Sequence, residues 1–131
     1  ANAASGPSAI KALIRPDLWG YLYDKKAWSA DSQTKWDRLT ANIPVSNIAM
    51  TSTALAAPSG SPLATQALLT TNAGGVAPIF VGIWGAVDLI RDPYADAQSG
   101  GLRLTALTTA DVTVARGSQL QLLTGLELAA S

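Results

Sequence analysis

The chain has 131 residues, contains no cysteine or histidine, and balances nine basic against nine acidic residues to a net charge of zero. The absence of both residue types excludes disulfides, the usual zinc ligands, and the Ser-His-Asp and Cys-His nucleophile pairs. Only 14% of the residues are charged. Such a charge-poor surface is typical of subunit interfaces, or of a monomer that is kept soluble by Ser, Thr, Asn and Gln. Neutrality without a basic stripe argues against specific nucleic-acid recognition. No run reaches the roughly 18 apolar residues of a membrane span.

The first predicted elements are a short strand and a helix. Residues 9–14 are apolar enough for a strand. Pro16 then stands where proline is favoured, in the first turn of a helix. Leu18, Tyr21 and Leu22 follow at the spacing of one helical face. This pattern predicts a helix that begins at Pro16.

The next segment is richer in polar and small residues. We expect a short helical turn over residues 32–39 and an extended segment over residues 43–50. Residues 51–62 are rich in Ser, Thr, Ala, Pro and Gly and are typical of a loop. Ser61-Pro62 is expected to cap a short helix that runs through Leu69.

The second half is strand-like. Residues 78–84 are apolar on both faces, which predicts a central strand. The remaining expectations are strands at 87–91 and 120–128, a turn at 92–94, a flexible loop at 95–101, and a half-buried hairpin of 102–107 and 111–116 around 108–110. Early helices and late strands indicate an α+β fold, with residues 1–131 forming a single domain around a mostly antiparallel or mixed sheet.

Three acidic residues of the second half could form a metal site. Asp88, Asp92 and Asp96 lie close in sequence, and three carboxylates can hold Ca²⁺ or Mg²⁺. Their spacing matches no calcium-binding loop, and Asp92-Pro93 is more simply an Asx turn. No serine lies in a sequence motif that also supplies a general base, so no serine nucleophile is predicted. We therefore predict no catalytic residue, no metal site and no cofactor, and hence no enzyme.

Aromatic residues offer a different kind of site. Trp19 and Tyr23 are one helical turn apart and can form a stacking patch for a sugar or a base. Packing in a core or an interface explains the same residues and is favoured, because aromatic side chains are enriched in both.

Residues 82–94, GIWGAVDLIRDPY, resemble a known signature. The run is similar to the Gly-x-Trp-Gly-Gly-x-Asp-Leu-x-x-Asp-Pro-Tyr pattern of tailed-bacteriophage major capsid proteins with the Hong Kong 97-type fold. Three further segments follow the family's order: residues 14–22 resemble its strand-to-helix step, residues 41–45 its Leu-x-Gly-x-Pro-Val segment with Asn42 in the glycine position, and residues 111–116 its Asp-Val-x-Val strand.

The resemblance implies the C-terminal part of a major capsid subunit. It implies the family's axial domain, a central mixed sheet flanked by short helices, with residual peripheral-domain strands. The subunit would form pentamers and hexamers of itself, with other capsid and scaffolding proteins as partners. The shell would enclose DNA in a virion assembled in the bacterial host cytoplasm. Alternatives are the shell protein of an encapsulin-like nanocompartment or gene-transfer particle, and a small ligand-binding module.

Subunit contacts are expected from two loops, residues 51–61 and 95–101, whose small residues tolerate close approach around a symmetry axis. The candidate contact residues are Ser59, Gly60, Ser61, Gln98, Ser99 and Gly100. The signature residues expected to pack are Trp84, Gly85, Asp88, Asp92, Pro93 and Tyr94, with Trp84 and Tyr94 beneath the loops.

Overall fold

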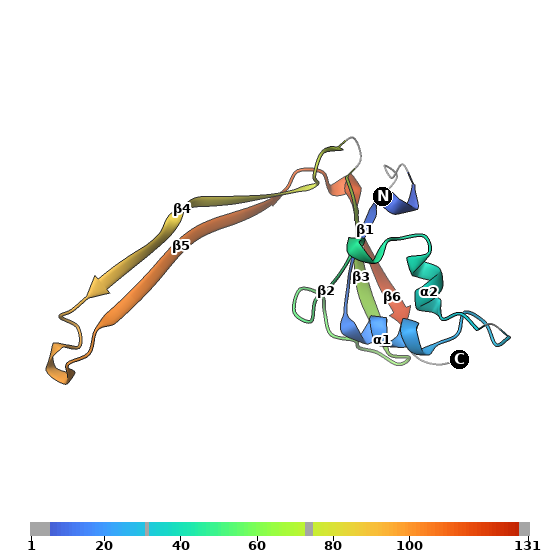
Figure 1. The fold of residues 1–131 in the computed structure, drawn as a ribbon, viewed down its shortest axis with the longest axis horizontal. Coiled ribbons are helices and arrows are strands. Elements are labelled where there is room, and N and C mark those ends of the chain that lie inside the picture. The colour runs from blue at the N-terminus through green and yellow to red at the C-terminus, as the bar shows by residue number, and fades with distance from the viewer. Residues whose placement is uncertain (1–5, 31, 73–74, 129–131) are drawn as a thin grey trace. The chain divides into compact units, whose positions relative to one another are not determined.

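The computed structural model describes residues 6–30, 32–72 and 75–128. It is an α+β structure with two short helices, a mixed four-stranded sheet and a separate two-stranded antiparallel sheet (Figure 1). The chain divides into two compact units: residues 1–78 with 116–131, and residues 79–115. We call them the sheet unit and the ribbon unit.

The sheet unit carries most of the regular elements. They are β1 (Ile10–Ile14), α1 (Pro16–Asp24), α2 (Lys35–Thr40), β2 (Ile48–Met50), β3 (Ala64–Thr71) and β6 (Leu120–Glu127), with single 3-10 turns at Pro7–Ala9, Val45–Asn47 and Gly117–Gln119. The strand order is β2-β1-β3-β6. The β1 and β2 strands are parallel, whereas β3 runs antiparallel to both β1 and β6. This part of the chain therefore forms the expected mixed sheet.

Local chemistry explains both helices. In α1, Pro16 occupies the first turn with Asp17 beside it, where an acidic side chain meets the positive end of the helix dipole. In α2, Thr34 is the N-cap and forms a capping box with Asp37. The backbone N–H and the hydroxyl of Thr34 both donate to the Asp37 carboxylate, and these bonds lower the pKa of Asp37. The second helix begins at Lys35, later than expected, because Thr34 caps it from outside.

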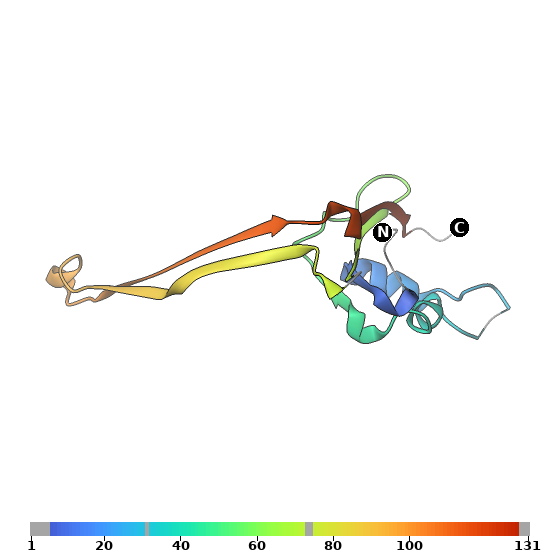
Figure 2. The same ribbon diagram turned by 90° about the horizontal axis from the view of Figure 1, so that it is seen from above.

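A small core joins the helices to the sheet. Ala12, Ile14, Leu18 and Ala67 form the buried cluster. The partly buried side chains packed against it are Leu22, Trp36, Ile48, Leu69, Leu123, Leu126 and Leu128. Leu18 and Leu22 come from α1 and Trp36 from α2, so the helices pack on one face of the sheet (Figure 2).

One predicted element of the sheet unit is wrong. The segment after Ser61-Pro62 is not a helix but strand β3, which pairs on both sides with β1 and β6. Its Ala, Leu and Thr residues suit either structure, and the two neighbouring strands decide the outcome. Thr65 and Ala67 then face inward and are buried.

The ribbon unit consists of two long strands. Strand β4 (Ile79–Asp92) and strand β5 (Arg103–Val114) pair antiparallel from Ile79↔Val114 to Asp92↔Arg103. A 3-10 turn, η4 (Ala97–Ser99), lies in the connection. We call this pair the ribbon.

Three expectations for the second half are wrong. Residues 78–84 do not form a central strand, because β4 pairs only with β5 and its side chains are exposed. Residues 87–91 are not a separate strand but continue β4. Residues 108–110 are not a turn but lie within β5, so the expected half-buried hairpin is absent from the described ribbon. The real turn lies at residues 93–102, where the Pro and Gly residues cluster.

Candidate subunit-contact surfaces

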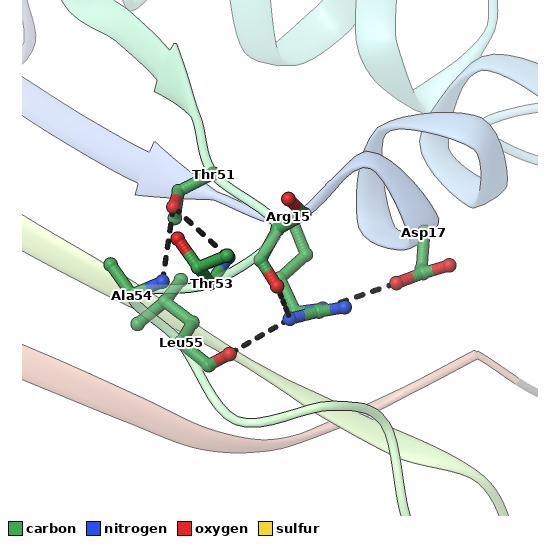
Figure 3. Close-up of polar contacts among 7 residues, drawn as sticks. Arg15, Asp17, Thr51, Thr53, Ala54 and Leu55 are labelled. Atoms are coloured by element: carbon green, nitrogen blue, oxygen red, sulfur yellow. Dashed lines mark hydrogen bonds and ion pairs between the residues drawn. The ribbon is translucent and has the colours of Figure 1, made fainter. Parts of the chain in front are cut away.

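The first surface is the loop that follows β2, residues 51–61. The side chain of Arg15 forms hydrogen bonds with the first part of this loop (Figure 3). Arg15 follows β1, and its Nη1 donates to the backbone oxygens of Ser52 and Leu55 at 2.7 and 2.8 Å. Its Nε contacts Asp17 Oδ2 at 3.1 Å. Thr51 Oγ1 accepts from the backbone N–H of Ala54 at 3.1 Å. Leu55 is buried, so the loop is anchored rather than free at this end.

The candidate contact residues of this loop form a tight exposed turn. The backbones of Ser59 and Ala64 donate to each other at 3.0 and 2.9 Å, which closes the turn. Gly60 has a φ of 94°, a conformation that residues with a Cβ rarely adopt. Ser59, Gly60 and Ser61 are all exposed, as a contact surface requires.

The second surface is the ribbon itself, whose register contains an irregularity in β4. Trp84 pairs with Thr109 and Asp88 with Leu107, so β4 holds two more residues than β5 between these pairs. Gly85 lies in this bulge with a φ of 76°. A Cβ at Gly85 would meet no atom within 4 Å. Glycine is therefore favoured there by its backbone conformation and not by lack of space.

Side chains alternate along each strand, so the register assigns every residue to one of two faces. The first, which we call the aliphatic face, carries Ile79, Val81, Ile83, Leu89, Arg91, Leu104, Ala106, Thr108, Ala110, Val112 and Val114. The second, which we call the mixed face, carries Phe80, Gly82, Trp84, Asp88, Ile90, Asp92, Arg103, Thr105, Leu107, Thr109, Asp111 and Thr113. Arg91 is the one charged residue of the aliphatic face so defined.

The aliphatic face is exposed to an unusual degree. Ile83, Leu89 and Val81 expose 68%, 66% and 64% of their surface. Burial of an aliphatic side chain stabilises a structure by about 1.5–3 kcal/mol, and a continuous exposed apolar patch marks an interaction site. Within the described ribbon unit, no second layer covers this face.

The connection at the end of the ribbon is ordered by its own hydrogen bonds. Asp92 Oδ1 accepts from the backbone N–H groups of Tyr94 and Ala95, which confirms the Asx turn. The backbone oxygen of Asp96 accepts from the backbone N–H groups of Ser99 and Gly101, each at 3.1 Å. The expected flexible loop is thus a defined turn around η4.

The candidate contact residues at this end, Gln98, Ser99 and Gly100, are all exposed. The turn that carries them has a fixed shape, because the Asp96 backbone oxygen and the Asx turn at Asp92 organise it.

The signature residues do not pack within the chain as expected. Trp84 is 61% exposed and lies over Gly82, where an added Cβ would approach its ring to 3.1 Å. Tyr94 is 85% exposed. The expected packing of Trp84 and Tyr94 beneath the loops is therefore wrong for the isolated chain. Asp88 and Pro93 are exposed as well.

Asp88, Asp92 and Asp96, the carboxylates that could hold a metal ion, all lie in the ribbon unit. Asp96 Oδ2 lies 3.5 Å from Arg103 Nε and forms an ion pair with it. Across the residues that the structure describes, no three Asp, Glu, His or Cys side chains gather in a metal-binding arrangement.

The aromatic residues of the sheet unit form the stack that the spacing of Trp19 and Tyr23 allows. The Trp19 and Tyr23 rings lie 5.4 Å apart at 25°, and Trp36 meets Trp19 edge-on at 6.5 Å. Tyr23 is 58% exposed, so the stack presents an open aromatic surface.

Sequence reasoning did not identify a groove between the helices and the sheet. Its volume is about 500 Å³. It is lined by Pro7, Ala12, Ile14, Leu18, Leu22, Lys35, Arg38, Leu39, Asn42, Ile43, Ala67, Leu69, Leu123 and Leu126. Among the lining residues that the structure describes, only Lys35 and Arg38 are charged. The apolar periodicity of α1 was the available signal, but it did not show that the helix leaves space beside it.

Among the described helices, none combines the length and apolar character needed to cross a membrane. A scan of protein-family models found no match to the chain, and searches of curated proteins and of solved structures also found none.

Proposed function

We propose that the chain is a structural shell subunit, the C-terminal part of a major capsid protein of a tailed phage or prophage. The observation that carries the proposal is the ribbon: two long strands, paired only with each other, that expose apolar side chains on both faces. A two-stranded sheet is at best marginally stable in water by itself. Such a ribbon needs a covering partner, which a subunit of a multi-copy assembly acquires from its neighbours.

The capsid signature coincides with this surface. Residues 82–94 span most of β4 and the Asx turn. Gly85 supports the bulge, Asp92 builds the turn, and Trp84 and Tyr94 expose large aromatic surfaces. The similarity to capsid proteins is therefore concentrated on the most exposed apolar part of the chain, where subunit contacts would be expected.

The free energy gained by covering the aliphatic face is similar to the cost of association, which favours many weak contacts over one strong contact. Seven larger aliphatic residues of the aliphatic face are each 37–68% exposed: Ile79, Val81, Ile83, Leu89, Leu104, Val112 and Val114. Covering each stabilises a contact by about 1 kcal/mol, or about 7 kcal/mol together. Association costs about 4–15 kcal/mol in lost freedom. One contact is therefore weak, and closure of a symmetric shell multiplies it.

The test is particle assembly by the gene product that carries this chain. Electron microscopy is expected to show closed particles of uniform size. Val112→Lys places a charge on the aliphatic face and should leave free subunits. Thr113→Lys is the matched control, because it places the same lysine on the same strand but on the mixed face, and it should assemble better than Val112→Lys. Absence of particles in the unsubstituted protein, or equal assembly of both variants, contradicts the proposal.

The contents of the particles distinguish a capsid from the first alternative, an encapsulin-like nanocompartment. A capsid encloses DNA, whereas an encapsulin-like nanocompartment encloses a cargo enzyme. Extraction of nucleic acid and protein from purified particles therefore decides between them.

The groove and the Trp19–Tyr23 stack favour a second candidate, a small ligand-binding module. Titration with glycans or nucleotides, followed by tryptophan fluorescence, tests it. A saturable change that Tyr23→Ala abolishes supports this function, and no saturable change removes it.

A further inference from the structure

The two outer edges of the ribbon differ in their protection against further strand pairing. Exposed edges usually carry proline, bulges, lysine or short strands, which block addition of another strand. The β4 edge is interrupted by the Gly85 bulge and is followed by Pro93. The β5 edge runs for 12 residues, RLTALTTADVTV, with no proline, glycine, lysine or extra residue.

We propose, on the basis of the shell function above, that β5 pairs with β5 of a second copy. The two strands run antiparallel about a two-fold axis at Leu107, and the two ribbons join into a four-stranded sheet with the order β4-β5-β5-β4. Closed two-fold pairing is the commonest way in which identical subunits associate.

Charge fixes the register. Arg103 and Asp111 are the only charged residues of β5, and both lie on the mixed face. With the axis at Leu107, Arg103 lies opposite Asp111 of the partner subunit, and Asp111 lies opposite the partner's Arg103. The same register places Thr105 opposite the partner's Thr109. Opposite charges and Thr–Thr pairs are both favourable cross-strand neighbours.

Neighbouring registers lose this complementarity. Moving the axis to Ala106 places Arg103 opposite Thr109 of the partner subunit. Moving it to Thr108 places Arg103 opposite the partner's Thr113. Neither register contains an ion pair. Contacts within the chain leave the proposed pair available. Arg103 contacts Asp96, but a guanidinium has five N–H donors and this side chain is 61% exposed. Asp111 Oδ1 accepts from the backbone N–H of Val112, and the second carboxylate oxygen can accept from the partner's Arg103.

Charge reversal and mixing test the register. The unsubstituted 131-residue chain should dimerise in sedimentation equilibrium. Arg103→Asp and Asp111→Arg should each raise the dimer Kd about tenfold, because two ion pairs become two like-charge contacts. An equimolar mixture of the two variants should recover the original Kd, since each heterodimer regains both pairs.

Cysteine crosslinking tests the position of the axis, and the cysteine-free chain makes the result simple to interpret. Leu107→Cys places two thiols opposite each other and should form a disulfide-linked dimer on mild oxidation. Leu104→Cys is the matched control: a leucine of the same strand with similar exposure, whose expected neighbour is Ala110 of the partner subunit. It should crosslink poorly alone and well when mixed with Ala110→Cys.

Each result supports or overturns the inference. A monomeric chain, a mixture that does not recover affinity, or equal crosslinking of Leu107→Cys and Leu104→Cys overturns it. These failures leave the shell function open, because that proposal is tested separately by particle assembly and by Val112→Lys on the aliphatic face.

Discussion

Two buried threonines of β3 give an unusual prediction, because their replacement by valine should stabilise the sheet unit. Thr65 is 2% exposed and Thr71 is fully buried. The Oγ1 atom of each is buried without a hydrogen-bond partner among the described residues. A buried hydroxyl without a partner costs about 1–3 kcal/mol. Valine keeps the shape and replaces the hydroxyl with a methyl group.

The expected gain is about 1 kcal/mol for Thr65→Val and about the same for Thr71→Val. The two sites are six residues apart on an extended strand, about 20 Å, so the double variant should gain about 2 kcal/mol. Thr65→Ser is the control, because it keeps the hydroxyl and loses the methyl group. It should lose about 1 kcal/mol.

Urea unfolding measures these changes. A Trp84→Phe background removes the tryptophan of the ribbon, so that fluorescence reports only on the three tryptophans of the sheet unit. The midpoint should rise with an unchanged slope. A loss of more than about 1 kcal/mol in Thr65→Val would mean that this hydroxyl forms a stabilising hydrogen bond, and the reasoning would fail.

Three further perturbations probe the loop, the bulge and the second helix. Gly85→Ala forces a side chain into a left-handed conformation and should weaken the ribbon by about 1–2 kcal/mol, seen as faster amide exchange in β4; unchanged exchange would contradict the assigned role. Arg15→Lys keeps the charge but loses the planar guanidinium that donates to the Ser52 and Leu55 backbone oxygens, so the Ala54 amide, which donates to Thr51 Oγ1 in the same loop, should exchange about tenfold faster; a folded variant with no change would show that other contacts hold the loop. The lowered pKa of Asp37 means that its contribution to stability is present above the ordinary aspartate pKa and is lost as the pH falls through the lowered value. An NMR titration should find this midpoint, and Thr34→Ala should move it upward; an unmoved midpoint would exclude Thr34 as the cause.

The sheet unit was predictable where the signals are local. Pro16 and the spacing of Leu18 and Leu22 are sufficient to place α1. The second helix was expected from residue 32, and the capping box of Thr34 and Asp37, which sets its start at Lys35, was not recognised in the sequence. The β3 strand was missed because Ala, Leu and Thr suit either a short helix or a strand. Its identity is settled by pairing with β1 and β6, and residues distant in the sequence decide that pairing.

The ribbon was misinterpreted for a different reason. Apolar residues on both faces of residues 79–84 are typical of a strand that is covered on both faces. The sequence pattern does not show what would cover this strand. The expectation of a central strand took the covering elements to be other parts of the same chain. The turn was misplaced to residues 108–110, although that segment has none of the usual turn residues. The exposed loop residues Ser59 and Gln98 were easier to place, because small and polar residues favour surface turns.

The bulge at Gly85 restricts how the length of β4 can change between related chains. It adds an even number of residues, so the strand beyond it keeps the same alternation as the strand before it. Loss of a single residue there would turn Asp88 onto the aliphatic face and Leu89 away from it. Loss of two would leave every side chain on its present side. Functional descendants of this chain should therefore vary in length at this point only in steps of two.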